Sequence, residues 1–202
     1  NAGQTCVCAN RILVQDSVYE AFAEKLAAAV SALKVAPGDQ DGSTIGPLIN
    51  RAAVEKVAAH VEDALAHGAT IFAQAPEGAT GERFATPLIL TGATRDMRLA
   101  SEETFGPVAP LFRFHDEAEG IALANDTSFG LASYFYTENL HRAFRVGERL
   151  EAGMVVLNTG GMAMEMAPFG GIKQSGLGRE GAHAGIEEYL ETKAFHIGGL
   201  KL

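Results

Sequence analysis

Apolar residues recur along the chain with two different periods, which predict alternating strands and helices. Residues 11–15 form a short apolar run typical of a buried strand. Ser17, followed by Glu20, predicts a capping box at the start of a helix that ends before Pro37 and Gly38. The apolar positions at helical spacing are Val18, Phe22, Leu26, Val30 and Leu33.

The alternation continues through the rest of the chain. A second helix is predicted from Asn50 to Gly68, with Val54, Val57, Val61 and Leu65 on one face. Strands are further expected at 69–73, 87–90, 108–114, 131–136, 154–157 and 192–197, and helices at 117–124, 139–150 and 180–190. This order predicts an α/β fold: three α/β/α layers around a largely parallel sheet, in one domain over residues 1–202.

Composition and charge restrict the classes of function. The chain has 202 residues, of which 47% are hydrophobic and 20% charged, as in a globular domain with a core. The 25 acidic and 16 basic residues give a net charge of −9, which argues against a nucleic-acid partner and against binding to anionic membranes. No apolar stretch approaches the roughly 18 residues of a transmembrane helix, and the first residues lack the pattern of a signal peptide.

Cysteine usage indicates a compartment and a candidate nucleophile. The 2 cysteines, Cys6 and Cys8, fit a reducing, cytoplasmic setting, and their place at the start of the chain suggests a fragment of a longer protein. Within Gly3-Gln4-Thr5-Cys6-Val7-Cys8, Cys6 is a candidate nucleophile for a carbonyl. The pair is alternatively two small buried residues. A metal site is not expected, because the 6 scattered histidines supply no further ligands.

Two later segments also carry candidate chemistry. Residues 101–107, Ser-Glu-Glu-Thr-Phe-Gly-Pro, are either a solvated turn or a ligand contact at the mouth of the sheet. In the second interpretation a carboxylate binds the hydroxyls of a ribose and the aromatic ring packs beside a flat heterocycle. Residues 168–181 contain a G-x-G-x-x-G from Gly176 to Gly181. We reject it as a dinucleotide fingerprint, because a glycine-rich loop precedes it and position 201 is a lysine.

Together these segments resemble the aldehyde dehydrogenase superfamily over essentially the whole chain. The resemblance rests on the cysteine motif, residues 103–107, residues 168–171 and the closing Tyr-Leu-Glu-Thr-Lys at 189–193. Residues 6–11 and 173–181 are most similar to succinate-semialdehyde dehydrogenases. The resemblance implies the catalytic domain of an NAD(P)-dependent enzyme, with the parent protein a homodimer or homotetramer.

The resemblance also implies roles for individual residues. Cys6 would attack the aldehyde to form a thiohemiacetal, NAD or NADP would accept the hydride, and water would hydrolyse the resulting thioester; the backbone N–H of Cys6 would stabilise the oxyanion. Glu103 would hold the nicotinamide ribose and Phe105 would lie against the nicotinamide. Lys56 falls near a position that reaches the adenosine ribose in some members.

Other parts of such an enzyme are expected outside this chain. In the family the general base, the oxyanion asparagine and the dinucleotide-binding domain precede the cysteine, so we expect the chain alone to be inactive. Ala163 and Met164 occupy the positions where similar enzymes place a substrate-binding serine. We therefore expect a small aldehyde as the substrate, succinate semialdehyde or a longer or less acidic relative.

Two further hypotheses concern regulation and an alternative role. In some similar enzymes the positions of Cys6 and Cys8 form a reversible disulfide that switches off activity; the alternative for Cys8 is a spectator thiol. A different class of function is a non-catalytic module for interaction or oligomerisation, because family members assemble through edges of this half.

Overall fold

The computed structural model describes residues 1–201 and contains a four-stranded sheet with the strand order β1-β4-β3-β2. Its strands are β1 (Ile12–Gln15), β4 (Val108–Phe114), β3 (Leu88–Ala93) and β2 (Thr70–Gln74). β1 and β3 each pair in parallel with β4, whereas β2 is antiparallel to β3. The sheet is therefore mixed but mainly parallel, as the alternation of strands and helices predicts.

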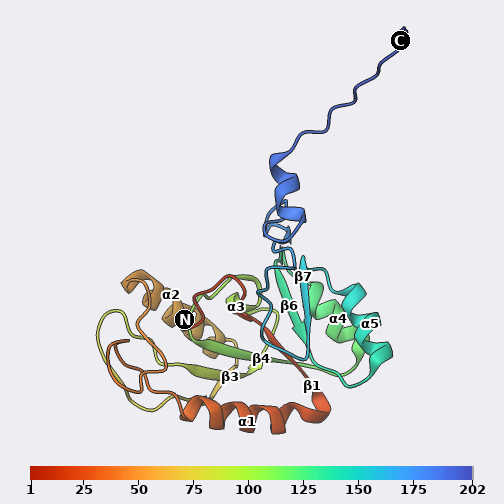
Figure 1. Cartoon of the computed structure of the whole chain (residues 1–202). Helices are drawn as coiled ribbons and strands as arrows, with labels where there is room; N and C mark the ends of the chain where they lie inside the picture. Colours follow the sequence, from red (N-terminus) through yellow and green to blue (C-terminus); the bar gives the residue numbers. More distant parts are fainter. Residues whose placement is uncertain (202) are drawn as a thin grey trace.

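Helices cover both faces of this sheet (Figure 1). α1 (Tyr19–Ser31) packs with one hydrophobic cluster and α2 (Arg51–Ala66) with the other. Ile89 belongs to the α1 cluster and Leu90 to the α2 cluster, because successive side chains of a strand point to opposite faces. Both side chains are 0% exposed, and each contributes about 1.5–3 kcal/mol through burial. The predicted three-layer arrangement is confirmed.

A second group of elements lies beside the four-stranded sheet. It contains α4 (Glu117–Asn125), the parallel pair β6 (Ala132–Phe135) and β7 (Met154–Leu157), and α5 (Leu140–Arg149). Short elements complete the chain: α3 (Arg98–Ser101), and the paired strands β5 (Phe129–Gly130) and β8 (Ile172–Lys173). These three short elements were not predicted, since each is too brief to show a period.

Arg11 joins the second group to the first. From the residue before β1, its guanidinium donates to the carbonyls of Leu123 and Ala124 at 2.8 Å each, at the C-terminal end of α4. Carbonyls of the last helical turn lack partners within the helix. The carbonyl of Leu123 also accepts from the capping amide of Asp126 at 3.3 Å, and the guanidinium supplies the further hydrogen bonds. Burial lowers the pKa of Arg11, and the nearby Asp126 carboxylate opposes that shift.

The predicted start of the first helix is wrong, whereas its predicted apolar face is confirmed in the second half: Val30 is buried, and Leu26 and Leu33 pack against the α1 cluster. A 3₁₀ turn, η1 (Asp16–Val18), precedes α1, and no side chain caps the helix at Val18. Tyr19 and Ala23 face the core, whereas Val18 and Phe22 are 52% and 38% exposed. The core takes Tyr19 because its hydroxyl donates to the carbonyl of Leu111 at 3.1 Å. By contrast, the second helix begins as predicted, with Asn50 accepting from the amide of Ala53.

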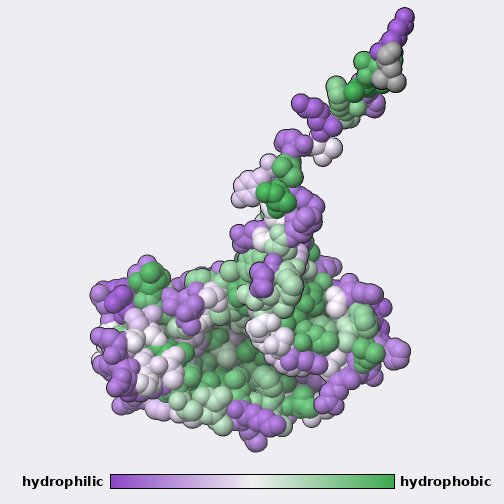
Figure 2. Space-filling view, viewed as in Figure 1, coloured by the Kyte–Doolittle hydropathy of each residue, from purple (hydrophilic) through white to green (hydrophobic). Residues whose placement is uncertain are grey.

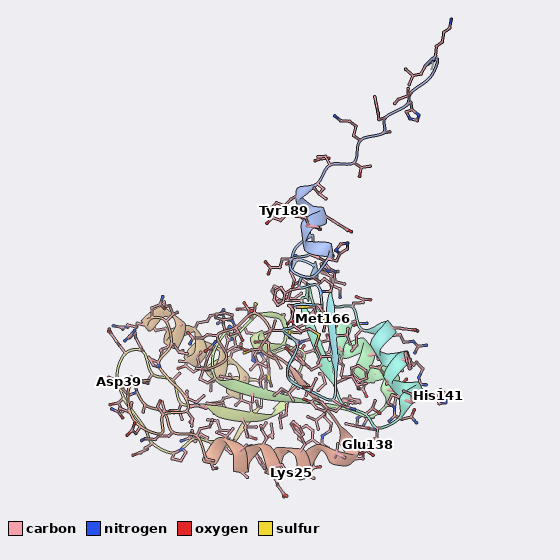
Figure 3. The ribbon with its side chains drawn as sticks, viewed as in Figure 1. Lys25, Asp39, Glu138, His141, Met166 and Tyr189 are labelled. Atoms are coloured by element: carbon pink, nitrogen blue, oxygen red, sulfur yellow. The ribbon has the colours of Figure 1, made fainter. Side chains whose placement is uncertain are left out.

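The predicted C-terminal elements are only partly present. η2 (Ala184–Tyr189) is a 3₁₀ helix where an α-helix was expected, and residues 192–197 form no strand. This segment extends away from the sheets, with Tyr189 at its base (Figures 1 and 3). Phe195 is 80% exposed. An alternating pattern makes a strand only where a neighbouring backbone supplies hydrogen bonds, and none lies beside this segment in the part of the chain that is described.

Apolar side chains gather in a hollow at the centre of the viewed face and again along the extended segment (Figure 2). Among residues 1–201, no helix has both the length and the apolar character needed to cross a membrane.

Candidate active site

The cysteine loop lies immediately before β1 and is held against the segment that precedes β4. Gly3 has φ +75°, and a Cβ atom there would lie 2.1 Å from the carbonyl oxygen of Gly106. Only glycine permits this approach of the two backbones. Within the loop the amide of Cys8 donates to the carbonyl of Thr5 at 3.0 Å. The structure therefore brings together two segments that lie about a hundred positions apart in the sequence.

Asn10 fixes the other end of the loop to the same segment. Its Nδ2 donates to the carbonyls of Leu99 and Glu102, each at 3.1 Å. Its Oδ1 accepts from the amide of Thr104 at 2.8 Å. One amide side chain thus satisfies three backbone groups, which holds the start of β1 and residues 99–104 in one register. No local pattern in the sequence indicates this role.

A buried histidine supports the same segment from behind. His60 on α2 is 0% exposed; its Nδ1 lies 3.1 Å from Thr104 Oγ1 and its Nε2 lies 3.2 Å from Glu102 Oε2. Burial lowers the pKa of His60, and the hydrogen bond to Glu102 opposes that shift. Arg98 donates two hydrogen bonds of 2.9 Å to Glu102, and these lower the pKa of that carboxyl to about 2. Lys56 is exposed one helical turn before His60.

Glu103 and Phe105 lie where this supported segment reaches solvent. Glu103 is exposed, and the ring of Phe105 is half-buried on a backbone with φ +54°. Ligands of α/β folds usually bind beyond the carboxyl ends of the strands. Glu103 and Phe105 precede β4, and the cysteine loop precedes β1, so the candidate site lies at the amino ends. The expectation based on that general rule is wrong here.

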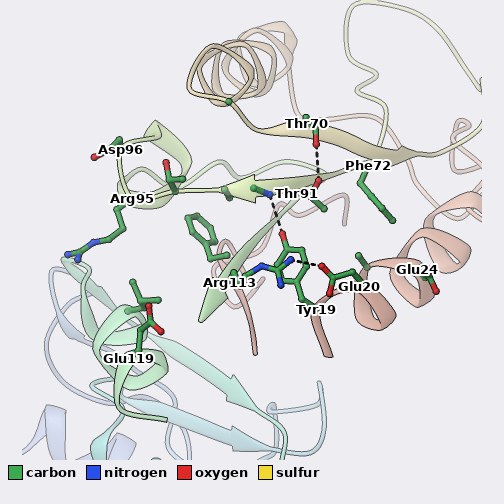
Figure 4. Close-up of a pocket in the computed structure, with 17 residues that line it drawn as sticks. Tyr19, Glu20, Glu24, Thr70, Phe72, Thr91, Arg95, Asp96, Arg113 and Glu119 are labelled. Carbon is green, nitrogen blue, oxygen red and sulfur yellow. Dashed lines mark hydrogen bonds and ion pairs between the residues drawn. The ribbon is translucent and has the colours of Figure 1, made fainter. Parts of the chain in front are cut away.

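A cavity of about 980 Å³ lies at the carboxyl ends of the strands (Figure 4). Arg113 donates to Glu20 at 2.6 Å and stacks 3.8 Å above the ring of Tyr19. The Tyr19 hydroxyl in turn accepts from the amide of Gly92 at 3.2 Å. None of the residues predicted for the active site lines this cavity, and these polar groups already have partners.

The two thiols are accessible. Cys6 and Cys8 are both exposed and not bonded to each other, so the interpretation as two small buried residues is wrong. Thr5 Oγ1 lies 2.6 Å from Cys8 Sγ, whereas Cys6 has no such hydroxyl beside it among the contacts found in residues 1–201. Because of this difference, the Cys6 thiol is the better candidate of the two for reaction with a carbonyl group.

Tyr134, which the sequence did not single out, contacts the cysteine loop from β6. Its hydroxyl donates to the carbonyl of Val7 at 2.8 Å and also lies 3.2 Å from Met162 Sδ. Burial raises the pKa of Tyr134, and the neighbouring Cys8 and Cys6 thiols add to that shift. In the sequence this tyrosine is one of several apolar residues of a strand, and no local pattern separates it from a core residue.

The predicted substrate positions line a second cavity, of about 550 Å³. Ala163 and Met164 border it together with Met162 and Phe169. The loop is held in place by a close approach of Gly153, whose added Cβ would lie 2.0 Å from the carbonyl oxygen of Gly170. Tyr134, through Met162, therefore connects this cavity to the cysteine loop.

The G-x-G-x-x-G sequence has a structural role in this loop. Arg179, between its second and third glycines, donates to the carbonyl of Gly171 at 2.8 Å, and its amide donates to Glu188. No α-helix begins there, and the next helical element is the 3₁₀ helix η2. A dinucleotide fingerprint opens an α-helix, so the geometry agrees with its rejection. In residues 1–201 no cluster of three His, Cys, Asp or Glu side chains has the geometry for a metal ion.

Comparison with known proteins identifies the family. The model of the aldehyde dehydrogenase family matches residues 1–195. The chain belongs to this family.

Its relatives include several dehydrogenases of small aldehydes. It is 60% identical over 195 residues to glutarate-semialdehyde dehydrogenase of Pseudomonas putida KT2440 (96% of this chain, 40% of the relative). It is 58% identical over 198 residues to the NADP(+) succinate-semialdehyde dehydrogenase of Escherichia coli K12 (98% and 41%). It is 58% identical over 200 residues to 3-sulfolactaldehyde dehydrogenase of Pseudomonas putida (99% and 41%). The chain thus spans about 40% of the length of these relatives.

Solved structures show the same fold. Succinate-semialdehyde dehydrogenase of Burkholderia pseudomallei is 58% identical, with a TM-score of 0.90 over 93% of this chain and 39% of that one. Betaine aldehyde dehydrogenase of Staphylococcus aureus in complex with NAD+ is 36% identical, with a TM-score of 0.88 over 95% of this chain and 39% of that one.

Proposed function

We propose that the chain is the catalytic domain of an NAD(P)-dependent aldehyde dehydrogenase in which Cys6 is the nucleophile. The observation that carries this proposal is the position of an exposed, unpaired thiol in a loop fastened directly to the Glu103–Phe105 segment. The Cys6 sulfur adds to the aldehyde carbon, giving a thiohemiacetal whose oxyanion the backbone amide of Cys6 helps to stabilise. Loss of hydride gives a thioester, and water then releases the carboxylic acid and the free thiol.

The residues present suit a nicotinamide dinucleotide. Glu103 offers an exposed carboxylate to the ribose hydroxyls, and Phe105 offers an aromatic face to the nicotinamide ring. The bound dinucleotide would supply the hydride acceptor. The dinucleotide-binding domain and the general base would come from outside these residues, since relatives are more than twice as long. Steady oxidation of aldehydes by the isolated chain with NAD(P)+ would contradict this division.

Paired substitutions test the nucleophile in the full-length protein. Cys6→Ser should abolish aldehyde oxidation, whereas Cys8→Ser should retain it, because only the first removes the attacking sulfur. Labelling of the thiols at neutral pH provides a second measurement. A Cys6 that reacts faster than free cysteine supports the nucleophile. Inert thiols together with clean self-association would instead favour the alternative role as an assembly module.

For the substrate we propose a small aldehyde with an anionic group at its far end, namely succinate semialdehyde or a longer relative. The named substrates of similar enzymes share such a group. Ala163 and Met164 offer apolar atoms to the cavity, which favours a longer carbon chain than that of succinate semialdehyde. The test compares kcat/KM for succinic, glutaric and unsubstituted aldehydes. Equal values for all three would overturn the proposal of an acidic substrate.

A further inference from the structure

Tyr134 occupies a position between the cysteine loop and the substrate loop. It lies in the middle of β6, in register with Val156 of β7. Its hydroxyl carries one proton, and the carbonyl of Val7 at 2.8 Å is a stronger acceptor than the thioether of Met162 at 3.2 Å. The hydrogen bond therefore goes to Val7, with the Met162 sulfur packed against the oxygen.

This hydrogen bond is distinctive in the cysteine loop. The loop is fastened at its ends by Gly3 and Asn10. Between those ends, the other hydrogen bonds of residues 5–9 connect residues of the loop to one another within the described residues 1–201. Tyr134 alone ties these five residues to another element of the described fold. The tie is at Val7, between the two cysteines, so it constrains the peptide units that direct both thiols.

The surroundings keep Tyr134 a hydrogen-bond donor. Burial, and then the neighbouring Cys8 and Cys6 thiols, raise the pKa of its hydroxyl. A negative charge on either sulfur would strengthen the preference for the protonated form. The group thus retains its proton at neutral pH, and nothing in the geometry makes it a base for the reaction.

We propose that Tyr134 is a positioning residue, whose hydroxyl holds the Val7 carbonyl and so aims the Cys6 thiol at the cavity bordered by Met162. This inference rests on the proposed function of Cys6. Because the same hydroxyl contacts both loops, a shift of the substrate loop at Met162 changes the place of the nucleophile. Misplacement of a reacting group by about 1 Å can lower a rate by about 100-fold, so one hydrogen bond is enough to matter.

The experiment compares Tyr134→Phe with Tyr136→Phe in the full-length protein. Tyr136 undergoes the same chemical change two residues later, where its side chain is 69% exposed. The first measurement is native-state hydrogen exchange at residues 5–9. Loss of one net hydrogen bond should speed exchange there by about 3- to 10-fold in Tyr134→Phe, while amides of α2 and β4 stay unchanged. The second is the kinetics of aldehyde oxidation, in which kcat should fall about 10-fold or more with KM little affected.

Each outcome decides the inference. Faster local exchange with a lower kcat in Tyr134→Phe, and neither change in Tyr136→Phe, supports the positioning role. Unchanged exchange at residues 5–9, faster exchange throughout the protein, or local loosening with unaltered kcat each overturn it. Failure of the proposed function has a different signature, since Cys6→Ser would then remain active whatever Tyr134→Phe does.

Discussion

Asn10 provides a severe test of how the candidate site is held together. Asn10→Asp preserves the shape of the side chain but replaces the Nδ2 donor with an oxygen. Two hydrogen bonds, to the carbonyls of Leu99 and Glu102, are lost, while the bond from the Thr104 amide remains. At about 1 kcal/mol for each bond, with added repulsion between oxygens, the free energy of unfolding should fall by about 2–4 kcal/mol.

Thermal unfolding followed by circular dichroism measures this loss. For a chain of this size 1 kcal/mol corresponds to about 2–4 °C, so the expected fall in Tm is about 4–16 °C. The loss should be smaller at pH 5 than at pH 8. A carboxyl that faces two carbonyl oxygens has a raised pKa in the folded state, and below that pKa its proton again donates to one of them.

The matched control is Asn139→Asp at the start of α5. The side chain of Asn139 accepts there from the amide of Arg142 at 2.9 Å, and within residues 1–201 it makes no hydrogen bond as a donor. Aspartate caps a helix as well as asparagine does, and its charge is favourable at a helix N-terminus. Its Tm should therefore stay unchanged or rise slightly. An Asn10→Asp protein as stable as the wild type, or equal losses in the two variants, would refute the reasoning.

Three further predictions follow from the same contacts. Gly3→Ala should lower the free energy of unfolding by more than about 2 kcal/mol, because the left-handed φ is unfavourable for alanine and the added Cβ clashes with the Gly106 carbonyl. Gly46→Ala should not, because the space around Gly46 is open. Denaturant titration measures both variants. Mild peroxide should oxidise Cys6 and Cys8 to a disulfide with water as the other product, seen as a reducible loss of about two mass units; no such loss excludes the switch. Because burial lowers the pKa of His60, the free energy of unfolding should fall as the pH drops below 6.5, where the histidine of the unfolded chain takes up its proton first. His60→Gln should reduce this dependence of the free energy of unfolding on pH. His141→Gln, on the surface of α5 (Figure 3), should retain it.

The sequence predicted those features that depend on neighbours along the chain. β4 and β7 have the predicted bounds, since continuous apolar runs mark buried strands. The second helix begins near Asn50 as predicted, and the structure shows Asn50 as its cap, accepting from the amide of Ala53. The first helix shows the limit of such reasoning. A 3₁₀ turn precedes it, and the first turns of the helix bury Tyr19 and Ala23 instead of Val18 and Phe22. The spacing of apolar residues does not show where a helix begins.

The candidate site likewise contains residues that a sequence motif predicts and residues that only the folded structure reveals. Cys6, Glu103 and Phe105 stand in short motifs, which predict them as candidate site residues without a structure. The residues that hold them were not predicted, because their contacts cross 92 positions for Asn10 and 127 for Tyr134. His60 is similar: on a helix face of valines it resembles a packing residue until Thr104 and Glu102 are seen against its ring. Local chemistry is visible in sequence, whereas its support depends on tertiary contacts.

The placement of the thiol at the amino ends of the strands has a mechanical consequence. Cys6 stands between the four-stranded sheet, to which Gly3 and Asn10 fasten its loop, and the β6–β7 pair, from which Tyr134 reaches it. Arg11, five residues after the thiol, binds the end of α4 and so sets the distance between those two groups. Its side-chain hydrogen bonds within residues 1–201 all go to the carbonyls of Leu123, Ala124 and Asp126. If α4 moved away from β1, we expect the hydrogen bond from Tyr134 to Val7 to weaken, so the proposed positioning of Cys6 would depend on this remote guanidinium as well as on its immediate contacts.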